Sequence, residues 1–357
     1  MTDGPGDGEQ LVVALDVGGT GMKCALVRPD GSVAHAERHP TDAGRGPDAV
    51  VETVLAVAEG LADRARAAGS TPVACGVAVP GVVDEAAGVA VWSANVGFRD
   101  VPLRDLVGAR LGLPAVLGHD VRVGGIAEAR LGAGRDARHV LFVAIGTGIA
   151  AAHVVAGSAA VGAHGAAGEI GHILVRPDGP RCGCGRPGCL EAVSSASAIA
   201  RRYAELADGT RTDPPGTGAS ASPVDAAAHA TDAAAHAIDA VPATTGTTRT
   251  ASRGTASAAE VAARAAAGEE LAGQVWREAV EALADGLATG QALYDVDTMV
   301  IGGGLARAGE QLLGPLRAAL HERMTFHREP RLVAAALGDE AGCLGAALLA
   351  LDSLERR

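Results

Sequence analysis

The chain has 357 residues, enough for one large domain or two ordinary ones, and 48% of its residues are apolar. Its 42 acidic and 30 basic side chains give a net charge of −12, whereas a dedicated nucleic-acid binder needs a basic face. No run of about 18 apolar residues indicates a membrane span, and the polar, acidic segment 1–10 does not resemble a secretory signal. We therefore expect a cytoplasmic protein that binds neither nucleic acid nor membrane.

Short apolar runs, glycine turns and amphipathic segments alternate along the first half of the chain. The spacing of the apolar residues predicts helices over 49–68, 103–111 and 124–131. It predicts strands over 11–15, 24–27, 73–79, 115–117 and 140–145. This alternation is typical of α/β architecture.

The second half contains a segment of unusual composition. Residues 208–255 consist almost entirely of Ala, Thr, Gly, Asp, Pro and His, which predicts a disordered, low-complexity insertion. Beyond it, Ser257 and Glu260 form a capping-box pattern for a helix that continues through Ala267. The pattern then predicts a long helix over 271–294, a strand over 298–301 and a last helix over 342–354.

Three glycine-rich turns follow predicted strands. Their small residues expose backbone N–H groups that can bind phosphate oxygens. The first turn adds a hydroxyl and the only lysine of the chain, and an ordinary hairpin turn is the alternative for each. Three such turns favour a nucleotide site between two related domains. The candidate nucleotide-binding residues are Asp16, Gly18, Gly19, Thr20 and Lys23, then Gly146, Thr147 and Gly148, and then Gly302, Gly303 and Gly304.

A cluster of cysteines predicts a metal site. Cys182, Cys184 and Cys189 lie within eight residues, and His172 precedes them by ten. Three thiolates and one imidazole satisfy tetrahedral Zn²⁺ and leave no open position, so we expect a structural zinc ion. Free thiols in a loop are the alternative, but the density of the cluster favours metal.

Two glutamates flank this cluster. Glu169 lies three residues before His172, and Glu191 lies two residues after Cys189. A bound zinc ion would fix the backbone that carries both carboxylates, which can accept hydrogen bonds from sugar hydroxyls. Surface acids in water are the alternative interpretation.

A further carboxylate follows the predicted strand 115–117. Residues at the carboxyl end of such a strand are well placed to face a cleft. Asp120 is therefore a candidate general base that takes the proton of a hydroxyl attacking the γ-phosphorus of ATP. An N-cap for the helix that begins near Val121 is the alternative role.

These elements, in this order, resemble the ROK family of sugar kinases (repressors, open reading frames, kinases). The resemblance runs from Leu11 to Leu351, apart from the insertion. Its most specific part is similar to the family's ExGH and CxCGxxGCxE signatures, here Gly168-Glu-Ile-Gly-His172 and Cys182-Gly-Cys-Gly-Arg-Pro-Gly-Cys-Leu-Glu191. The stretch from Asp16 to Lys23 is similar to the phosphate motif of actin-like ATPases.

The resemblance implies two ribonuclease-H-like domains that close over Mg²⁺-ATP and a sugar, usually in a homodimer or homotetramer. The expected small domain is 1–118 with 341–357, and the expected large domain, 119–340, contains the zinc knuckle 172–191. The resemblance implies Asp120 as the base. The sugar ligands that it implies are Asn95, Asp120, Glu169, His172 and Glu191.

Two positions depart from the family pattern. His119 stands where the family's kinases usually have an asparagine before the catalytic aspartate, which affects the choice of sugar. Alanines at 150–152 follow the second glycine turn, where the family often continues with glycines.

The first hypothesis is an ATP-dependent kinase that makes a hexose 6-phosphate, with glucose favoured. Mannose, fructose, N-acetylglucosamine and N-acetylmannosamine remain open as acceptors, and polyphosphate remains open as donor. A sugar-responsive repressor would need a helix-turn-helix domain of about 80 residues ahead of the phosphate motif, which here begins at Asp16. A zinc redox sensor would leave the glycine turns and Asp120 without a role.

Overall fold

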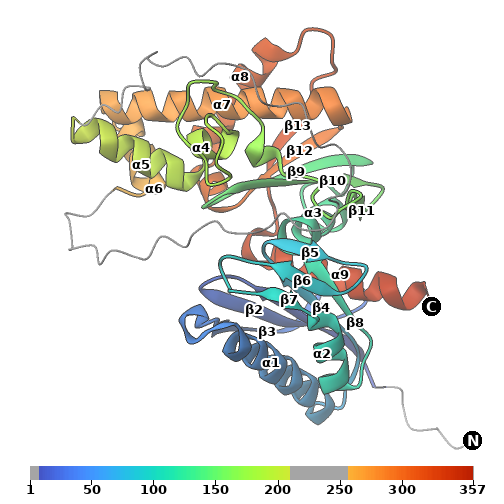
Figure 1. Ribbon diagram of the computed structural model, residues 1–357. Coiled ribbons are helices and arrows are strands. Elements are labelled where there is room, and N and C mark those ends of the chain that lie inside the picture. Colours follow the sequence, from blue (N-terminus) through green and yellow to red (C-terminus); the bar gives the residue numbers. More distant parts are fainter. Residues whose placement is uncertain (1–7, 210–255, 357) are drawn as a thin grey trace, which may run out of the picture.

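The computed structural model describes residues 8–209 and 256–356 (Figure 1). The predicted insertion 208–255 lies outside the described residues except for its first two positions, and so do residues 1–7 of the N-terminal segment. Two five-stranded sheets lie one above the other in the view of Figure 1. The α/β prediction is confirmed.

The two sheets share one topology. The first sheet has the order β3-β2-β1-β4-β8, and the second has the order β11-β10-β9-β12-β13. In each sheet an antiparallel hairpin (β1–β2 or β9–β10) adjoins two parallel strands. Two related halves, as the glycine turns predicted, are therefore present. The strands are β1 (Gln10–Val17), β2 (Gly21–Val27), β3 (Val33–Pro40), β4 (Thr71–Val79), β8 (Ala115–His119), β9 (His139–Ile145), β10 (Ile149–Val155), β11 (Ser158–Ala159), β12 (Thr298–Gly302) and β13 (Arg331–Ala334).

The first sheet is covered on both faces because its central strands are apolar throughout. Along β1, Leu11, Val13 and Leu15 pack with helices α1 (Pro47–Ala67) and α2 (Leu103–Leu111). The alternate residues, Val12 and Ala14, pack with α9 (Ala341–Glu355). This two-residue alternation is the period of a β-strand, so one short segment serves two cores.

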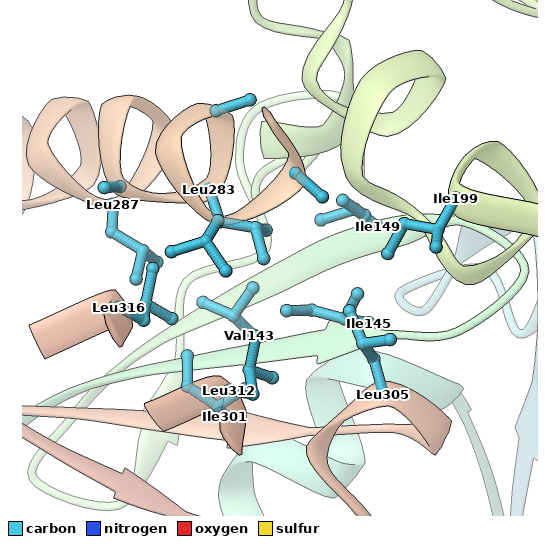
Figure 2. Close-up of a cluster of buried hydrophobic side chains, with 14 of the residues drawn as sticks. Val143, Ile145, Ile149, Ile199, Leu283, Leu287, Ile301, Leu305, Leu312 and Leu316 are labelled. Atoms are coloured by element: carbon cyan, nitrogen blue, oxygen red, sulfur yellow. The ribbon is translucent and has the colours of Figure 1, made fainter. Parts of the chain in front are cut away.

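The second sheet buries one face under the helices of the C-terminal half. Figure 2 shows Val143, Ile145 and Ile301 of the sheet packed against Leu283 and Leu287 of α7 (Glu270–Tyr294). The helices that complete this layer are α4 (Leu190–Ser194), α5 (Ala196–Ala207), α6 (Ala258–Ala266) and α8 (Glu310–Arg323). The capping box predicted for Ser257 and Glu260 forms at the start of α6.

Helix α3 (Asp120–Arg130) lies between the two sheets and joins them. Its Ala129 packs with Phe142 and Val154 of the second sheet, while its Val123 and Ile126 belong to the core under the first sheet. A Cβ at Gly345 would lie 1.9 Å from the carbonyl oxygen of Val123, so α3 and α9 make very close contact. A small third sheet consists of β5 (Val82–Asp84), β6 (Val89–Trp92) and β7 (Arg99–Val101). Its strand β5 contacts β8, the strand that leads into α3.

Most of the predicted helices and strands are present, although many begin or end at other residues. The structure also contains elements that the sequence pattern did not indicate, such as β3 and β5. Helix α3 begins at Asp120, four residues before the predicted start, because charged and apolar residues alternate over 120–123 and show no helical period. Strand β10 includes the alanines at 150–152, which pair regularly with β9. Among the described residues, no helix combines the length and the apolar character that crossing a membrane requires.

Candidate active site

The first glycine turn joins β1 and β2. The N–H of Gly18 donates to the carbonyl of Gly21 at 3.0 Å, and the hydroxyl of Thr41 donates to the carbonyl of Gly18 at 2.6 Å. The N–H groups of Gly19 and Thr20 have no hydrogen-bond partner among the described residues. The turn therefore presents two donors of the kind that bind phosphate oxygens, and Thr41, which the sequence did not indicate, holds it in place.

Asn95 lies next to this turn. A Cβ at Gly19 would lie 3.0 Å from the Cβ of Asn95, so a larger residue at this position would displace Asn95. The Asn95 side chain is exposed, in the connection between β6 and β7. The predicted sugar ligand and the predicted phosphate turn are thus neighbours, as transfer between two substrates requires.

Lys23 extends from β2 toward a group of carboxylates. Its Nζ lies 3.4 Å from Oδ2 of Asp16. Burial raises the pKa of Asp16, Lys23 opposes that rise, and Asp120 and Asp339 add to it. Lys23, Asp16, Asp120 and Asp339 therefore act on one another electrostatically.

Asp120 is the first residue of α3. Its Oδ1 accepts the N–H of Val121 at 2.7 Å, and 36% of its side-chain surface remains exposed. Burial raises the pKa of Asp120 to about 6, although Val121, Arg122 and Lys23 each lower it. A carboxylate with that pKa is ionised at neutral pH and basic enough to accept a hydroxyl proton.

His119 and Arg122 surround this carboxylate. Nδ1 of His119 lies 3.4 Å from Oδ1 of Asp120. Burial, and then the charge of Arg122, lower the pKa of His119 to about 4, so its imidazole is neutral. Arg122 forms a buried ion pair with Glu85. Neither Arg122 nor Glu85 belongs to a motif, and so sequence reasoning missed both.

The second and third glycine turns meet at the end of β9. A Cβ at Gly303 would lie 2.4 Å from the carbonyl oxygen of Ile145, directly before Gly146. The N–H of Thr147 has no hydrogen-bond partner within the described ranges. The second turn is fixed from outside as well, since the N–H of Ala196 donates to the carbonyl of Gly146. The structure therefore brings these two predicted phosphate turns together.

His172, Cys182, Cys184 and Cys189 form one cluster. Their ligand atoms all lie within 4.8 Å of one another. Nδ1 of His172 is 3.5 Å from Sγ of Cys182, and the Sγ atoms of Cys184 and Cys189 are 3.6 Å apart. Tetrahedral zinc with Zn–S bonds of about 2.3 Å separates its sulfur ligands by about 3.8 Å. The spacing of the four side chains therefore fits a tetrahedral metal ion.

The pKa values of the three thiols also favour a metal site. The backbone N–H of Arg186 lowers the pKa of Cys184 to about 6, whereas burial raises the pKa of Cys182 and Cys189. A bound cation deprotonates thiols that would otherwise stay protonated. Two of the three thiols therefore become ligands only with the help of the metal itself.

Two glutamates adjoin the cluster, as predicted. Oε2 of Glu169 lies 3.8 Å from Nε2 of His172, on the side of the ring opposite the cysteines. Oε2 of Glu191 accepts the N–H of Ile149 at 3.0 Å, directly after the second glycine turn. In the part of the chain that the structure describes, no hydrogen bond or ion pair joins Asp120 to either glutamate. Glu169 nevertheless acts electrostatically on His119, the neighbour of Asp120, since its charge opposes the fall in the pKa of His119.

The whole chain has the pattern of a known family. Residues 12–353 match the sequence profile of the ROK family. The chain belongs to the ROK family. A Thermotoga maritima glucokinase is 31% identical over 343 residues, with 94% of this chain and 96% of the relative covered. An Escherichia coli O157:H7 N-acetylmannosamine kinase is 29% identical, with 95% and 97% covered.

Solved ROK structures share the fold. A ROK hexokinase from Thermus thermophilus is 28% identical, with a TM-score of 0.76 and coverage of 97% of this chain and 100% of that one. A ROK-family glucokinase from Streptomyces griseus, solved in complex with glucose and AMPPNP, is 26% identical, with a TM-score of 0.70 and coverage of 96% and 99%. The actin-like ATPase fold, with its paired ribonuclease-H-like halves, is therefore confirmed for this ROK protein.

Proposed function

We propose that this ROK protein is a glucokinase, which transfers the γ-phosphoryl group of ATP to the 6-hydroxyl of glucose. As a member of the family with kinase relatives over its full length, it is an ATP-dependent sugar kinase. One observation carries the proposal furthest. Asp120, the first residue of α3, lies near Lys23 of β2, whose Nζ is 3.4 Å from Oδ2 of Asp16 before the first phosphate turn.

Asp120 takes the proton from the attacking hydroxyl as the hydroxyl oxygen approaches the γ-phosphorus. The N–H groups of Gly19 and Thr20 hold phosphate oxygens, and Lys23 neutralises part of their charge. The turns at 146–148 and 302–304 hold the rest of the nucleotide from the other half. Mg²⁺ bound with ATP would neutralise part of the charge that develops on the phosphates.

The sugar is proposed to lie where the two halves meet, with Asn95, Asp120, Glu169, His172 and Glu191 as its ligands. Zinc, held by His172, Cys182, Cys184 and Cys189, has a structural role in this proposal. Since Nδ1 of His172 faces Cys182, metal binding there leaves Nε2 free to face the sugar beside Glu169. The domains 1–118 with 341–357 and 119–340 would close over both substrates.

N-acetylmannosamine is the second candidate acceptor. It is favoured by the relative named N-acetylmannosamine kinase, which this chain matches over almost its full length. The neutral His119 beside Asp120 replaces the family's usual asparagine, so the contact to the sugar hydroxyls differs from the usual one. Glucose is preferred because the Thermotoga maritima glucokinase is 31% identical to this chain, against 29% for the N-acetylmannosamine kinase.

A panel of hexoses with Mg²⁺-ATP and coupled detection of ADP tests this proposal. We expect glucose-dependent ADP release above that with N-acetylmannosamine, mannose, fructose or N-acetylglucosamine. The Asp120→Ala variant is the matched control and should release no sugar-dependent ADP. Sugar-dependent turnover that is highest with another hexose would replace glucose in the proposal, and no turnover with any hexose would overturn it.

A further inference from the structure

Glu85 and Arg122 form a buried ion pair at the start of α3. Nε of Arg122 donates to Oε1 of Glu85 at 2.7 Å, and the side chains are 3% and 19% exposed. The same Oε1 accepts the backbone N–H of His119 at 3.2 Å. Because His119 is the N-cap of α3, Glu85 holds the turn of the helix on which Asp120 lies.

The other end of Arg122 reaches the second half of the molecule. Its Nη1 donates to the carbonyl oxygen of Gly165 at 2.8 Å. Gly165 lies four residues before Glu169, in the loop that leads to His172. This loop also lies against β5, since a Cβ at Gly165 would be 2.8 Å from the carbonyl oxygen of Val83. Arg122 therefore connects the helix of the candidate base to the loop of the candidate sugar ligands.

The free energy of folding alone does not favour this buried ion pair. Burying a guanidinium and a carboxylate is expensive, and apolar replacements of similar volume are often as stable or more so. In addition, Nη2 of Arg122 is buried and has no hydrogen-bond partner among the described residues, which is unfavourable for a buried donor. Proteins place such locally unfavourable groups mainly at functional sites.

We propose that Arg122 and Glu85 are positioning residues that hold the Asp120 end of α3 in register with the loop carrying Glu169. The pair thereby aligns the base with the sugar hydroxyl, an inference that rests on the proposed sugar kinase function. Arg122 touches neither substrate in this account and acts through the backbone at His119 and Gly165.

Arg122 has a second, electrostatic effect on the base. The charged groups near the Asp120 carboxylate are Lys23 on β2, Asp16 on β1 and Arg122 on α3 itself. Lys23 and Arg122 lower the pKa of Asp120, burial raises it, and the neighbouring His119 is neutral. Removal of the Arg122 charge therefore moves the pKa of Asp120 further upward, an effect that Arg122→Lys, which keeps the charge, does not share.

The test compares Arg122→Gln and Arg122→Lys with Arg130→Gln, a matched control. Arg130 lies on the same helix and pairs with Asp352 at 2.9 Å, away from the site. Thermal unfolding, kcat and KM for glucose and ATP, and the pH profile of kcat/KM for glucose are measured on the full chain. For Arg122→Gln we expect kcat/KM for glucose to fall about 10- to 100-fold, while KM for ATP changes less than about two-fold. The acid limb of the pH profile, where kcat/KM falls as pH is lowered, should move to higher pH.

Arg122→Lys separates the two effects, because lysine keeps the charge but lacks the planar fork. Its acid limb should stay near that of the wild type while kcat/KM for glucose still falls, and Arg130→Gln should change neither. The proposal is overturned if Arg122→Gln only lowers the melting temperature, with kcat/KM and the acid limb unchanged. If Arg122→Gln does not fold, a wild-type kcat/KM for Arg122→Lys overturns it.

The controls also separate this proposal from the function on which it rests. If the wild type phosphorylates no sugar, the proposed function has failed. If the wild type is active and the Arg122 variants behave as Arg130→Gln does, only the positioning role has failed.

Discussion

Oε2 of Glu191 accepts the backbone N–H of Ile149 at 3.0 Å. Glu191 follows the last cysteine of the metal cluster by two residues, and Ile149 directly follows the second glycine turn. A Cβ at Gly148 would lie 2.5 Å from the same carboxylate oxygen. The cluster that carries the candidate sugar ligands is thus attached directly to a candidate phosphate turn.

This attachment predicts different effects for two substitutions of Glu191. Glutamine keeps an oxygen that can accept the Ile149 N–H, so Glu191→Gln should unfold within about 1 kcal/mol of the wild type. Glu191→Ala removes the acceptor and should lower kcat/KM for both glucose and ATP. Chemical denaturation and steady-state kinetics check this, and equal kinetic effects of the two variants would contradict the attachment.

Asp120→Asn should abolish catalysis and spare the fold. Loss of a general base typically costs about 10²- to 10⁴-fold in rate, while the amide oxygen can still accept the Val121 N–H. The measurement is kcat with glucose, beside circular dichroism. A variant with more than a tenth of the wild-type kcat would remove Asp120 from the mechanism.

Asp120 also links pH to stability. Its folded pKa, about 6, is above the unfolded value of about 3.9, so its contribution to stability is full below the unfolded pKa and is lost as pH rises through the folded pKa. At pH 8 the folded protein carries a partly desolvated carboxylate, and Asp120→Asn should therefore unfold at a higher temperature than the wild type. The two proteins should converge near pH 4. A lower melting temperature for Asp120→Asn at pH 8 would contradict the assigned direction of the pKa shift.

Activity should follow the ionisation of the same carboxylate. Since only the ionised form accepts a proton, kcat/KM for glucose should fall on the acid side of about pH 6, the pKa of Asp120 in the folded protein. The pH profile of kcat/KM reports the free enzyme and is the appropriate measurement. An acid limb near pH 4 would indicate a base with an ordinary carboxyl pKa.

Zinc removal should affect the sugar side first. We expect one zinc ion per chain by elemental analysis, lost in Cys184→Ser and retained in Cys75→Ala, whose thiol is buried in the other half. A chelator or Cys184→Ser should lower the melting temperature and raise KM for glucose more than KM for ATP. Metal-free protein with normal stability and normal KM for glucose would refute the structural role.

The sequence indicated those parts of the site that lie within one stretch of chain. The glycine turns, the Cys-His cluster and the position of Asp120 after β8 all follow from local spacing, and the structure brings the cluster and the turns together. The partners from distant segments could not be predicted. Glu85 reaches Arg122 across 37 positions, and Asp339 lies near Lys23, 316 positions earlier, only because α9 returns to the first sheet.

Residues of common type were missed for a second reason. Thr41 and Arg122 belong to no motif, and their roles arise from burial and from single hydrogen bonds to Gly18 and Gly165. One signal was available for α3, since the charged Arg122 stands between Val121 and Val123 in its first turn. Burial of this residue to 2% exposure is visible only once the two halves are placed together.

Transfer of label from ATP to glucose tests the central claim most directly. Purified protein is incubated with glucose and Mg²⁺-ATP carrying an isotopic label in the γ-phosphoryl group, and the products are resolved by phosphorus NMR. The account predicts labelled glucose 6-phosphate in amounts equal to the ADP formed, and none with Asp120→Ala. ADP accompanied by free inorganic phosphate, or the absence of any phosphorylated sugar, would contradict it.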